Sequence, residues 1–262
     1  MVLHQNLVYH KWDGEMKSDI KPIVLHNDVV CIADSHWKNG DTELLECLNA
    51  LQNSQVLLMG DIAQMLVGNL ATSIESNKAL LECIQRLSER SCVYWLEGNH
   101  DFGLQALAQI LPKVIFVPRK HQPLMATYKG MIVSLAHGDL FLNIRYKLYI
   151  NVLNSYFGLW ALRCVDWLSN GYVYRTLQKS IDSKHIRGFY GEYEAFCVRR
   201  VEAYKKYFCK HDVMPQVIIE GHFHLGHSTY VNTKEENILY VCLPSFYVDR
   251  RIFELESTIV DR

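Results

Sequence analysis

The feature that most constrains the fold of this chain is a set of five short polar clusters, each of which directly follows an apolar, β-forming segment. The clearest is Gly98-Asn99-His100-Asp101, which comes after the apolar run 92–96. In α/β proteins, ligand sites form at the carboxyl ends of the strands. This cluster is therefore predicted to deliver metal-binding or catalytic side chains from the edge of a sheet.

The other four clusters have the same placement and supply complementary side chains. They follow strands predicted over 29–33, 56–59, 131–135 and 217–219, and in order they are Asp34-Ser35-His36, Gly60-Asp61, His137-Gly138-Asp139 and Gly221-His222-Phe223-His224. Alternate residues of an extended segment share a face, so both side chains of an Asp-x-His or His-x-His pair are expected to point the same way. All five clusters are predicted to contribute to one site.

The candidate ligands in these clusters combine carboxylates, imidazoles and one amide, a set that suits Mn²⁺, Fe²⁺, Co²⁺ or Zn²⁺. Seven ligands are too many for one tetrahedral ion, and they match two divalent ions that share a bridging carboxylate. The candidates are Asp34, His36, Asp61, Asn99, His137, His222 and His224.

The rest of the chain predicts a mixed α/β sandwich. Segments with helical spacing, such as 42–51 and 76–87, alternate with strands in the first half, and the end is rich in strands. A chain of 262 residues can bury a full core. The net charge of −1 argues against a nucleic-acid partner, and eight cysteines without a Cys-x-x-Cys pair favour a reducing, cytoplasmic compartment.

Taken together, the five clusters resemble the signature of the calcineurin-like metallophosphoesterases, in the order that this family uses. The resemblance implies a four-layer αββα sandwich and a two-metal hydrolase. It also implies that Asp34, His36 and His224 hold one ion and that Asn99, His137 and His222 hold the other, with Asp61 as the bridge. The ions would activate a water and clamp the phosphoryl oxygens.

The same resemblance gives roles to two further residues and exposes one departure. His100 would stabilise the transition state or protonate the leaving group, and Asp101 would orient it. Many family members have an acidic residue where this chain has Gln64, so any role of that carboxylate is open.

A long insertion separates His137 from His222 and is predicted to be a helical cap. The expected division is a core at 1–139 and 212–262, and a cap at 140–211. The insertion carries more than half of the chain's aromatic residues, and twelve basic residues against five acidic ones. Apolar spacing over 144–168 predicts an amphipathic helix. Such a cap either packs its aromatics onto the sandwich or binds an amphiphile with anionic and acyl parts.

This layout is similar to that of the UDP-2,3-diacylglucosamine pyrophosphatases of lipid A synthesis, which carry a helical, acyl-binding insertion at the same place. The similarity implies hydrolysis of a nucleotide-diphospho-lipid to UMP and 2,3-diacylglucosamine 1-phosphate, with two Mn²⁺ ions, on the cytoplasmic face of the inner membrane. The best-known branch has arginine where this chain has His100. Arg145 and Lys147 are the candidates for phosphate contact, although solvated surface charge is the alternative.

Two other functions stay open at this point. The same metal centre could act on a different nucleotide or phosphoester; the phosphoprotein phosphatase pattern fits poorly, because Gly-Asp-x-x-Asp-Arg-Gly and Gly-Asn-His-Glu do not occur. Alternatively, the chain could be a non-catalytic scaffold on this fold, which is expected to have lost metal ligands.

Overall fold

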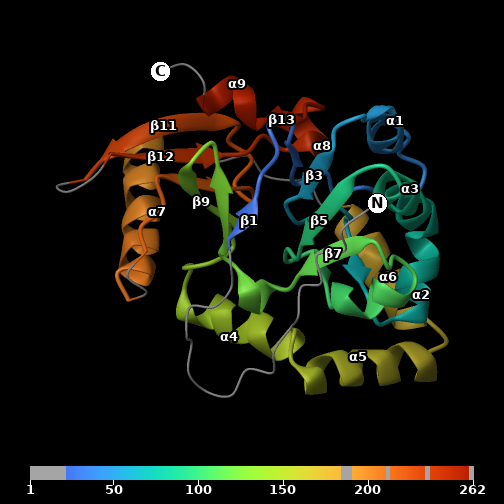
Figure 1. Cartoon of the computed structure of the whole chain (residues 1–262). Helices are drawn as coiled ribbons and strands as arrows, with labels where there is room; N and C mark the ends of the chain where they lie inside the picture. Colours follow the sequence, from blue (N-terminus) through green and yellow to red (C-terminus); the bar gives the residue numbers. More distant parts are fainter. Residues whose placement is uncertain (1–21, 184–190, 211–212, 234–236, 260–262) are drawn as a thin grey trace.

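The computed structural model describes residues 22–183, 191–210, 213–233 and 237–259, and in them two β-sheets pack face to face between layers of helices (Figure 1). The five-stranded sheet has the order β13 (Phe253–Glu254), β2 (Val30–Ile32), β3 (Gln55–Leu58), β5 (Cys92–Leu96) and β7 (Val114–Val117). The six-stranded sheet has the order β1 (Ile23–Val24), β8 (Leu124–Tyr128), β9 (Met131–Ala136), β10 (Val217–Glu220), β12 (Asn237–Cys242) and β11 (His227–Asn232).

The strands that precede the polar clusters are parallel within each sheet. In the first sheet β2, β3 and β5 are parallel, and in the second β9 and β10 are parallel. Both faces of these strands are covered, which is why they are continuous apolar runs rather than alternating ones. In β3, for example, Leu57 faces the second sheet, whereas Val56 and Leu58 face the helices.

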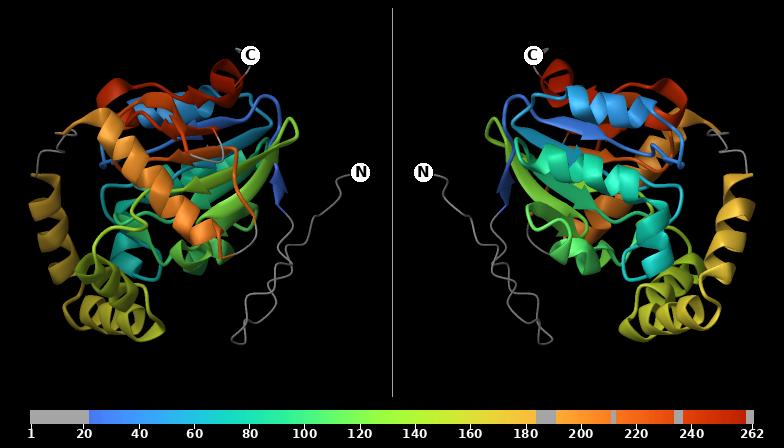
Figure 2. Two further views of the ribbon diagram at one scale, coloured as in Figure 1. Left: turned by 90° about the vertical axis from the view of Figure 1, so that its left-hand side faces the viewer. Right: turned by 90° about the vertical axis from the view of Figure 1, so that its right-hand side faces the viewer.

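Helices complete the sandwich on both outer faces. α1 (Glu43–Ala50) and α3 (Lys78–Ser88) cover the five-stranded sheet, and α7 (Tyr193–Phe208) covers the six-stranded one. The order helix, sheet, sheet, helix confirms the predicted αββα architecture (Figure 2). Shorter elements connect these layers: α2 (Ala71–Ser76), η1 (Leu104–Gln109), η2 (Arg119–His121), α8 (Phe246–Asp249), α9 (Leu255–Ile259) and a ribbon of β4 (Leu66–Val67) with β6 (Asp101–Phe102).

The insertion divides into two parts that pack differently. α4 (Ile144–Leu153), α5 (Tyr156–Leu168) and α6 (Tyr172–Asp182) form a cap against the β4–β6 ribbon and α2 (Figures 1 and 2). α7 instead buries Phe196, Val201 and Tyr204 on the six-stranded sheet. The structure therefore differs from the expected cap at 140–211, because α7 belongs to the sandwich. Residues 1–21, 184–190, 211–212, 234–236 and 260–262 of that division lie outside the described residues.

The single helix predicted over 144–168 is in fact two helices. α4 ends at Leu153, and Ser155 starts α5 because its side-chain oxygen accepts a hydrogen bond from the backbone N–H of Gly158. A serine in this position caps the free N–H groups of a new helix. Among the described residues, no helix is long and apolar enough to cross a membrane.

Candidate metal centre

The loops after five parallel strands bring the predicted ligands to one edge of the sandwich. Asp34 and His36 follow β2, Asp61 follows β3, and Asn99 follows β5. The second sheet supplies His137 after β9, together with His222 and His224 after β10. Candidate ligand atoms of three sets of these residues and His100 lie within 4.8 Å of one another: Asp34, His36 and His224; His36, Asp61 and His100; and Asp61, His137 and His222.

The backbone at these ligands is held in an uncommon conformation. Asp34, His36, Asp61, His222 and His224 all have positive φ angles, from 44° to 67°. Left-handed backbone is unfavourable for residues with a Cβ and persists where the surrounding structure enforces it, as at functional sites. The fold therefore holds these five residues in a strained backbone conformation that positions their side chains at one site.

Two glycines of the clusters are needed to bring the loops this close. A Cβ at Gly60, where φ is 91°, would overlap the imidazole of His137. A Cβ at Gly98 would overlap the carboxylate and the backbone nitrogen of Asp61. Each glycine thus lets one ligand loop pass against the ligand of another.

The first group joins the two sheets through Asp34. One carboxylate oxygen, Oδ2, accepts a hydrogen bond of 2.7 Å from the backbone N–H of His222. The other, Oδ1, lies 3.4 Å from Nε2 of His224 and has no hydrogen-bond partner. Both ring nitrogens of His36 and Nδ1 of His224 are buried without a partner as well, so four polar side-chain atoms of this group are unsatisfied by protein.

The second group is centred on Asp61 and His137. Nδ1 of His137 lies 3.1 Å from the carbonyl of Met59, which can only accept, so Nδ1 carries the proton and Nε2 is directed to the site. Nε2 lies 3.2 Å from Oδ1 of Asn99 and 3.5 Å from Oδ2 of Asp61. The ring of His222 is 5.0 Å from that of His137, centroid to centroid.

Burial decides the pKa of His36, whereas neighbouring histidines decide the pKa of Asp61. Burial lowers the pKa of His36 to about 4, so at neutral pH its imidazole is uncharged and able to bind a cation. Burial alone would raise the pKa of Asp61, but His137 and His100 hold it well below its usual value. Asp61 is thus a carboxylate surrounded by imidazoles.

The donor set fits two divalent ions. Buried polar atoms without a partner carry a free-energy cost that a bound cation would remove, and Asp34, His36 and His224 all have such atoms. The first group has the three residues that the resemblance implies, and the second joins His137 and His222 to Asp61, with Oδ1 of Asn99 3.2 Å from His137. This mixture of oxygen and nitrogen donors suits several divalent transition metals.

The orientation of His100 differs from the expectation. Its Nδ1 lies 2.7 Å from the backbone carbonyl of Gln64, so this nitrogen carries the proton and donates to the carbonyl. Asp101 instead accepts from the backbone N–H groups of Asp61, Ile62 and Gly98 and from the indole of Trp95. Asp101 therefore braces the loops that carry the ligands, and the prediction that it orients His100 is wrong.

Gln64, where many family members have an acidic residue, contacts the cap through its side-chain amide. Its side-chain Nε2 donates to the carbonyl of Ile181, 3.2 Å away at the end of α6. A carboxylate at this position could not donate to that carbonyl. Gln64 therefore contacts both the cap, through its side chain, and His100, through its backbone.

Arg145 and Lys147 are not brought to the centre. Both are exposed on α4, and neither lines the pocket described below. The residue between them, Tyr146, does line it: its hydroxyl donates to Oδ2 of Asp139, which also accepts from Arg119. In the sequence, the signal for this contact was Asp139, the third residue of the His-Gly-Asp cluster, to which no role was assigned.

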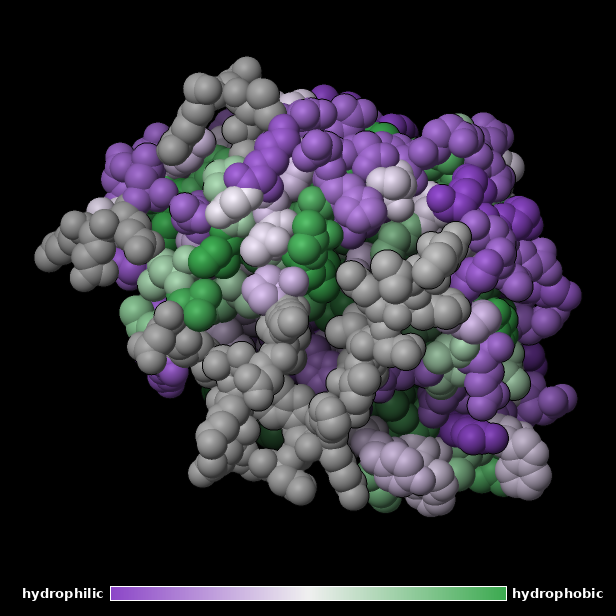
Figure 3. All heavy atoms as spheres, in the orientation of Figure 1, coloured by the Kyte–Doolittle hydropathy of each residue, from purple (hydrophilic) through white to green (hydrophobic). Residues whose placement is uncertain are grey.

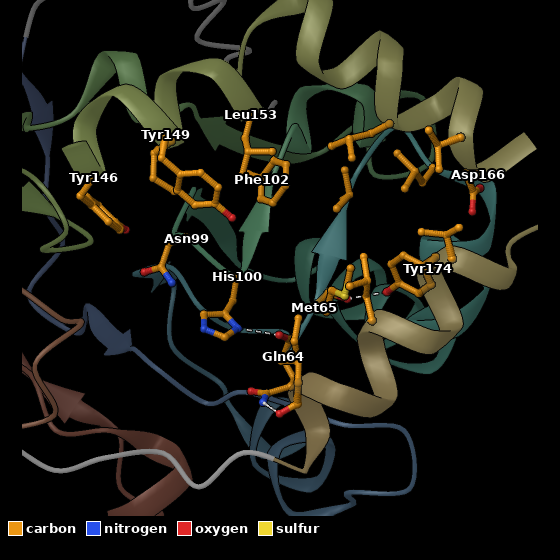
Figure 4. A pocket seen from close by; sticks show the side chains of 18 residues that line it. Gln64, Met65, Asn99, His100, Phe102, Tyr146, Tyr149, Leu153, Asp166 and Tyr174 are labelled. Atoms are coloured by element: carbon orange, nitrogen blue, oxygen red, sulfur yellow. Dashed lines mark hydrogen bonds between the residues drawn. The ribbon is translucent and has the colours of Figure 1, made fainter. Parts of the chain in front are cut away.

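A pocket of about 430 Å³ extends from this centre into the cap (Figure 4). Asn99, His100 and Tyr146 line one end. Beyond them the wall is mostly apolar and comes from β4, β6 and helices α4, α5 and α6, with Val67, Phe102, Leu153, Leu162, Val165, Val173, Tyr174 and Leu177 among its residues. The cap thus encloses an apolar space that begins at the candidate metal centre.

Several solved structures are similar to the chain at low identity. Vps29 from Entamoeba histolytica matches at 12% identity over 81% of this chain and 72% of that one, with a TM-score of 0.35. Phosphopantetheinyl hydrolase from Mycobacterium tuberculosis matches at 12% identity over 86% and 92%, with a TM-score of 0.35. An archaeal phosphodiesterase matches at 10% identity over 88% and 94%, with a TM-score of 0.38.

The family assignment comes from the sequence itself. A comparison with curated proteins gives no match. The model of the calcineurin-like phosphoesterase family matches residues 28–226, a span that contains all five polar clusters. The chain therefore belongs to the calcineurin-like phosphoesterases, a family of metal-dependent phosphoester hydrolases.

Proposed function

We propose that this chain hydrolyses the pyrophosphate of an acylated nucleotide sugar, UDP-2,3-diacylglucosamine, to UMP and 2,3-diacylglucosamine 1-phosphate. The observation that carries the proposal is the pocket, which has Asn99 and His100 of the candidate metal centre at one end and an apolar wall beyond them. Its volume of about 430 Å³ is in the range of small-ligand sites. A substrate with a phosphate group joined to acyl chains has the same two-part chemistry.

The polar end of the pocket would receive the pyrophosphate. Two divalent ions, which we propose to be Mn²⁺, would be held by the seven candidate ligands with Asp61 between them. When bound, such ions activate a water and neutralise phosphoryl oxygens. His100, fixed through Nδ1 by Gln64, presents its other ring nitrogen to this end. Because a phosphate is already a good leaving group, we assign His100 to stabilising phosphoryl charge in the transition state.

The apolar end would hold an acyl chain. Leu153 and Phe102 lie on one side of the space in Figure 4, and Tyr174 lies on another. The hydroxyl of Tyr174 donates to the carbonyl of Met65, so its polar atom is satisfied by protein and its ring is left to face the pocket. Removing acyl chains from water into such a wall provides affinity in proportion to the area buried.

The outer surface of the cap would rest on the membrane that supplies this substrate. Tyr156 and Trp167 on α5 are 89% and 79% exposed, and Phe157 and Trp160 are exposed as well. Pale and green residues gather along the lower edge of the molecule, where α5 lies (Figure 3). Exposed Arg145 and Lys147 would meet anionic lipid headgroups, and the proposed location is the cytoplasmic face of the inner membrane.

The test is turnover of UDP-2,3-diacylglucosamine by the purified chain with Mn²⁺, measured as release of UMP. UDP-N-acetylglucosamine, which lacks the long chains, and bis(p-nitrophenyl) phosphate serve as parallel substrates. We expect cleavage of the diacylated substrate to exceed that of UDP-N-acetylglucosamine by more than about 100-fold, because burial of several methylene groups contributes to transition-state binding.

Two variants separate the metal centre from the pocket. Asp61→Asn is expected to abolish cleavage of every substrate, whereas Leu153→Trp, which fills the pocket, should impair only the diacylated one. Cleavage of the simple diester without cleavage of the lipid would contradict the proposed substrate and favour another phosphoester. Absence of both activities and of bound metal would favour the non-catalytic scaffold.

A further inference from the structure

A buried ionic network lies directly behind one half of the candidate metal centre. Glu220, at the end of β10 and fully buried, is the residue before Gly221-His222. Its carboxylate accepts hydrogen bonds from Nε and Nη2 of Arg200, at 2.6 and 2.7 Å, and from the hydroxyls of Tyr204 and Tyr240, at 2.7 and 2.6 Å. This charged group is therefore satisfied without water.

Arg200 extends the same network to a second ligand loop. From α7, its Nη1 donates to the carbonyl of Leu140 at 2.8 Å, and its Nη2 donates to the carbonyl of Gly138 at 3.0 Å. Gly138 directly follows His137. The guanidinium, which also lies 5.0 Å from the ring centre of Phe223, thus joins the loop of His137 to the strand that carries His222.

The network is attached beside both histidines of one ligand group, whereas in the other group only His224, the residue after Phe223, shares a loop with it. His137 and His222, whose rings are 5.0 Å apart, are the residues next to its attachment points. Asp34 and His36 are positioned from β2 in the other sheet, and the bonds of Arg200 and Glu220 do not involve them. Among the described residues, the Arg200–Glu220 pair therefore links the two loops of the His137–His222 half directly and makes no hydrogen bond to Asp34 or His36.

We propose that Arg200 and Glu220 are positioning residues for the His137–His222 half of the centre and that they control binding of the second ion but not of the first. The inference rests on the two-ion centre of the proposed function, not on its lipid substrate. A buried ion pair is a weak source of stability, since apolar replacements of similar volume are often neutral. Its retention here is accounted for by geometry, because a bidentate pair fixes both loops in distance and in angle.

The experiment removes the Arg200–Glu220 pair without leaving a buried charge. Arg200→Met combined with Glu220→Leu deletes both charges, and Mn²⁺ binding is followed by calorimetry and by metal content after desalting. We expect wild type to bind two ions. The double variant should bind one ion with unchanged affinity and the other at least about tenfold more weakly, as after loss of a residue that orients a metal ligand. His222→Ala should give the same pattern.

A matched control tests whether any arginine that binds carbonyls has this effect. Arg90 donates to the carbonyls of Leu48, Asn49 and Leu51, which precede β3, as Arg90 precedes β5, whereas the ligand loops follow these strands. Arg90→Met is expected to leave the binding of both ions unchanged, even where it lowers the melting temperature. If the double variant does not fold, Tyr240→Phe, which deletes one bond to Glu220, should weaken the same ion to a smaller degree.

The outcomes separate this inference from the proposed function. A wild-type chain that binds fewer than two Mn²⁺ ions contradicts the two-ion centre and this inference with it. Two ions bound by wild type, and both bound with unchanged affinity by the double variant or by Tyr240→Phe, would overturn the inference alone. Equal weakening of both ions would also overturn it, because that result indicates general destabilisation rather than positioning of one half.

Discussion

Helices α5 and α7 come from the same insertion and have similar aromatic content, yet they behave in opposite ways. α7 buries Phe196, Val201 and Phe208 against the six-stranded sheet. α5 leaves Tyr156 and Trp167 almost fully exposed. The difference teaches that an aromatic stripe becomes core only where a complementary surface is available. α7 lies along a sheet, whereas α5 meets the short helices α4, α6 and α2 and a two-stranded ribbon.

The largest expected effect is on the α7 side. Phe208→Ala should lower the free energy of unfolding by about 3–5 kcal/mol, because a buried aromatic ring is lost and a cavity remains. Urea unfolding followed by circular dichroism measures this change. Phe208→Leu is the control and should cost less than half as much. A loss below about 1 kcal/mol would show that α7 is not part of the core.

An intermediate effect is expected where the cap is attached to the sandwich. Tyr174 of α6 is buried, and its hydroxyl donates to the carbonyl of Met65 at 2.7 Å. Tyr174→Phe should reduce the free energy of unfolding by about 1 kcal/mol, the net value of one hydrogen bond. The same unfolding experiment checks it, with the exposed Tyr172→Phe as control. Equal values for the two variants would contradict the assigned contact.

The smallest effect on stability is expected at the exposed face of α5. Phe157→Ser with Trp167→Ser should change the free energy of unfolding by less than about 0.5 kcal/mol, since neither side chain is buried. The same variant should lose most of its sedimentation with anionic phosphatidylglycerol vesicles. Unchanged vesicle binding would remove the support for membrane contact, and a large loss of stability would show that α5 is packed in solution.

Much of the fold was predictable because it depends on local pattern. The run 92–96 is β5 with the predicted bounds, because a segment buried on both faces has to be apolar throughout. The break between α4 and α5 was missed because the apolar spacing continues across it. Its only signal was Ser155, whose capping role depends on the bond it makes to Gly158.

The candidate metal ligands could be predicted from the sequence, but the hydrogen-bond partners that orient the site residues could not. Histidine and aspartate after strands could be recognised by type, and the structure brings them together. The partner of His100 is a backbone carbonyl, at Gln64, and any residue can provide one. Arg145 and Lys147 were selected by charge alone, and the helix places both on its exposed side.

By itself, the sequence determined the chemistry of this protein: five strands that end in candidate metal ligands, glycines that let their loops approach, and membership of the phosphoesterase family. The tertiary structure alone decided which side chains support that chemistry. In the sequence, Glu220 is only an acidic residue at the end of an apolar strand. In the structure, α7 places Arg200 against it. The reason is physical: a ligand's identity is a property of one residue, whereas its orientation depends on hydrogen bonds to groups that folding alone brings near.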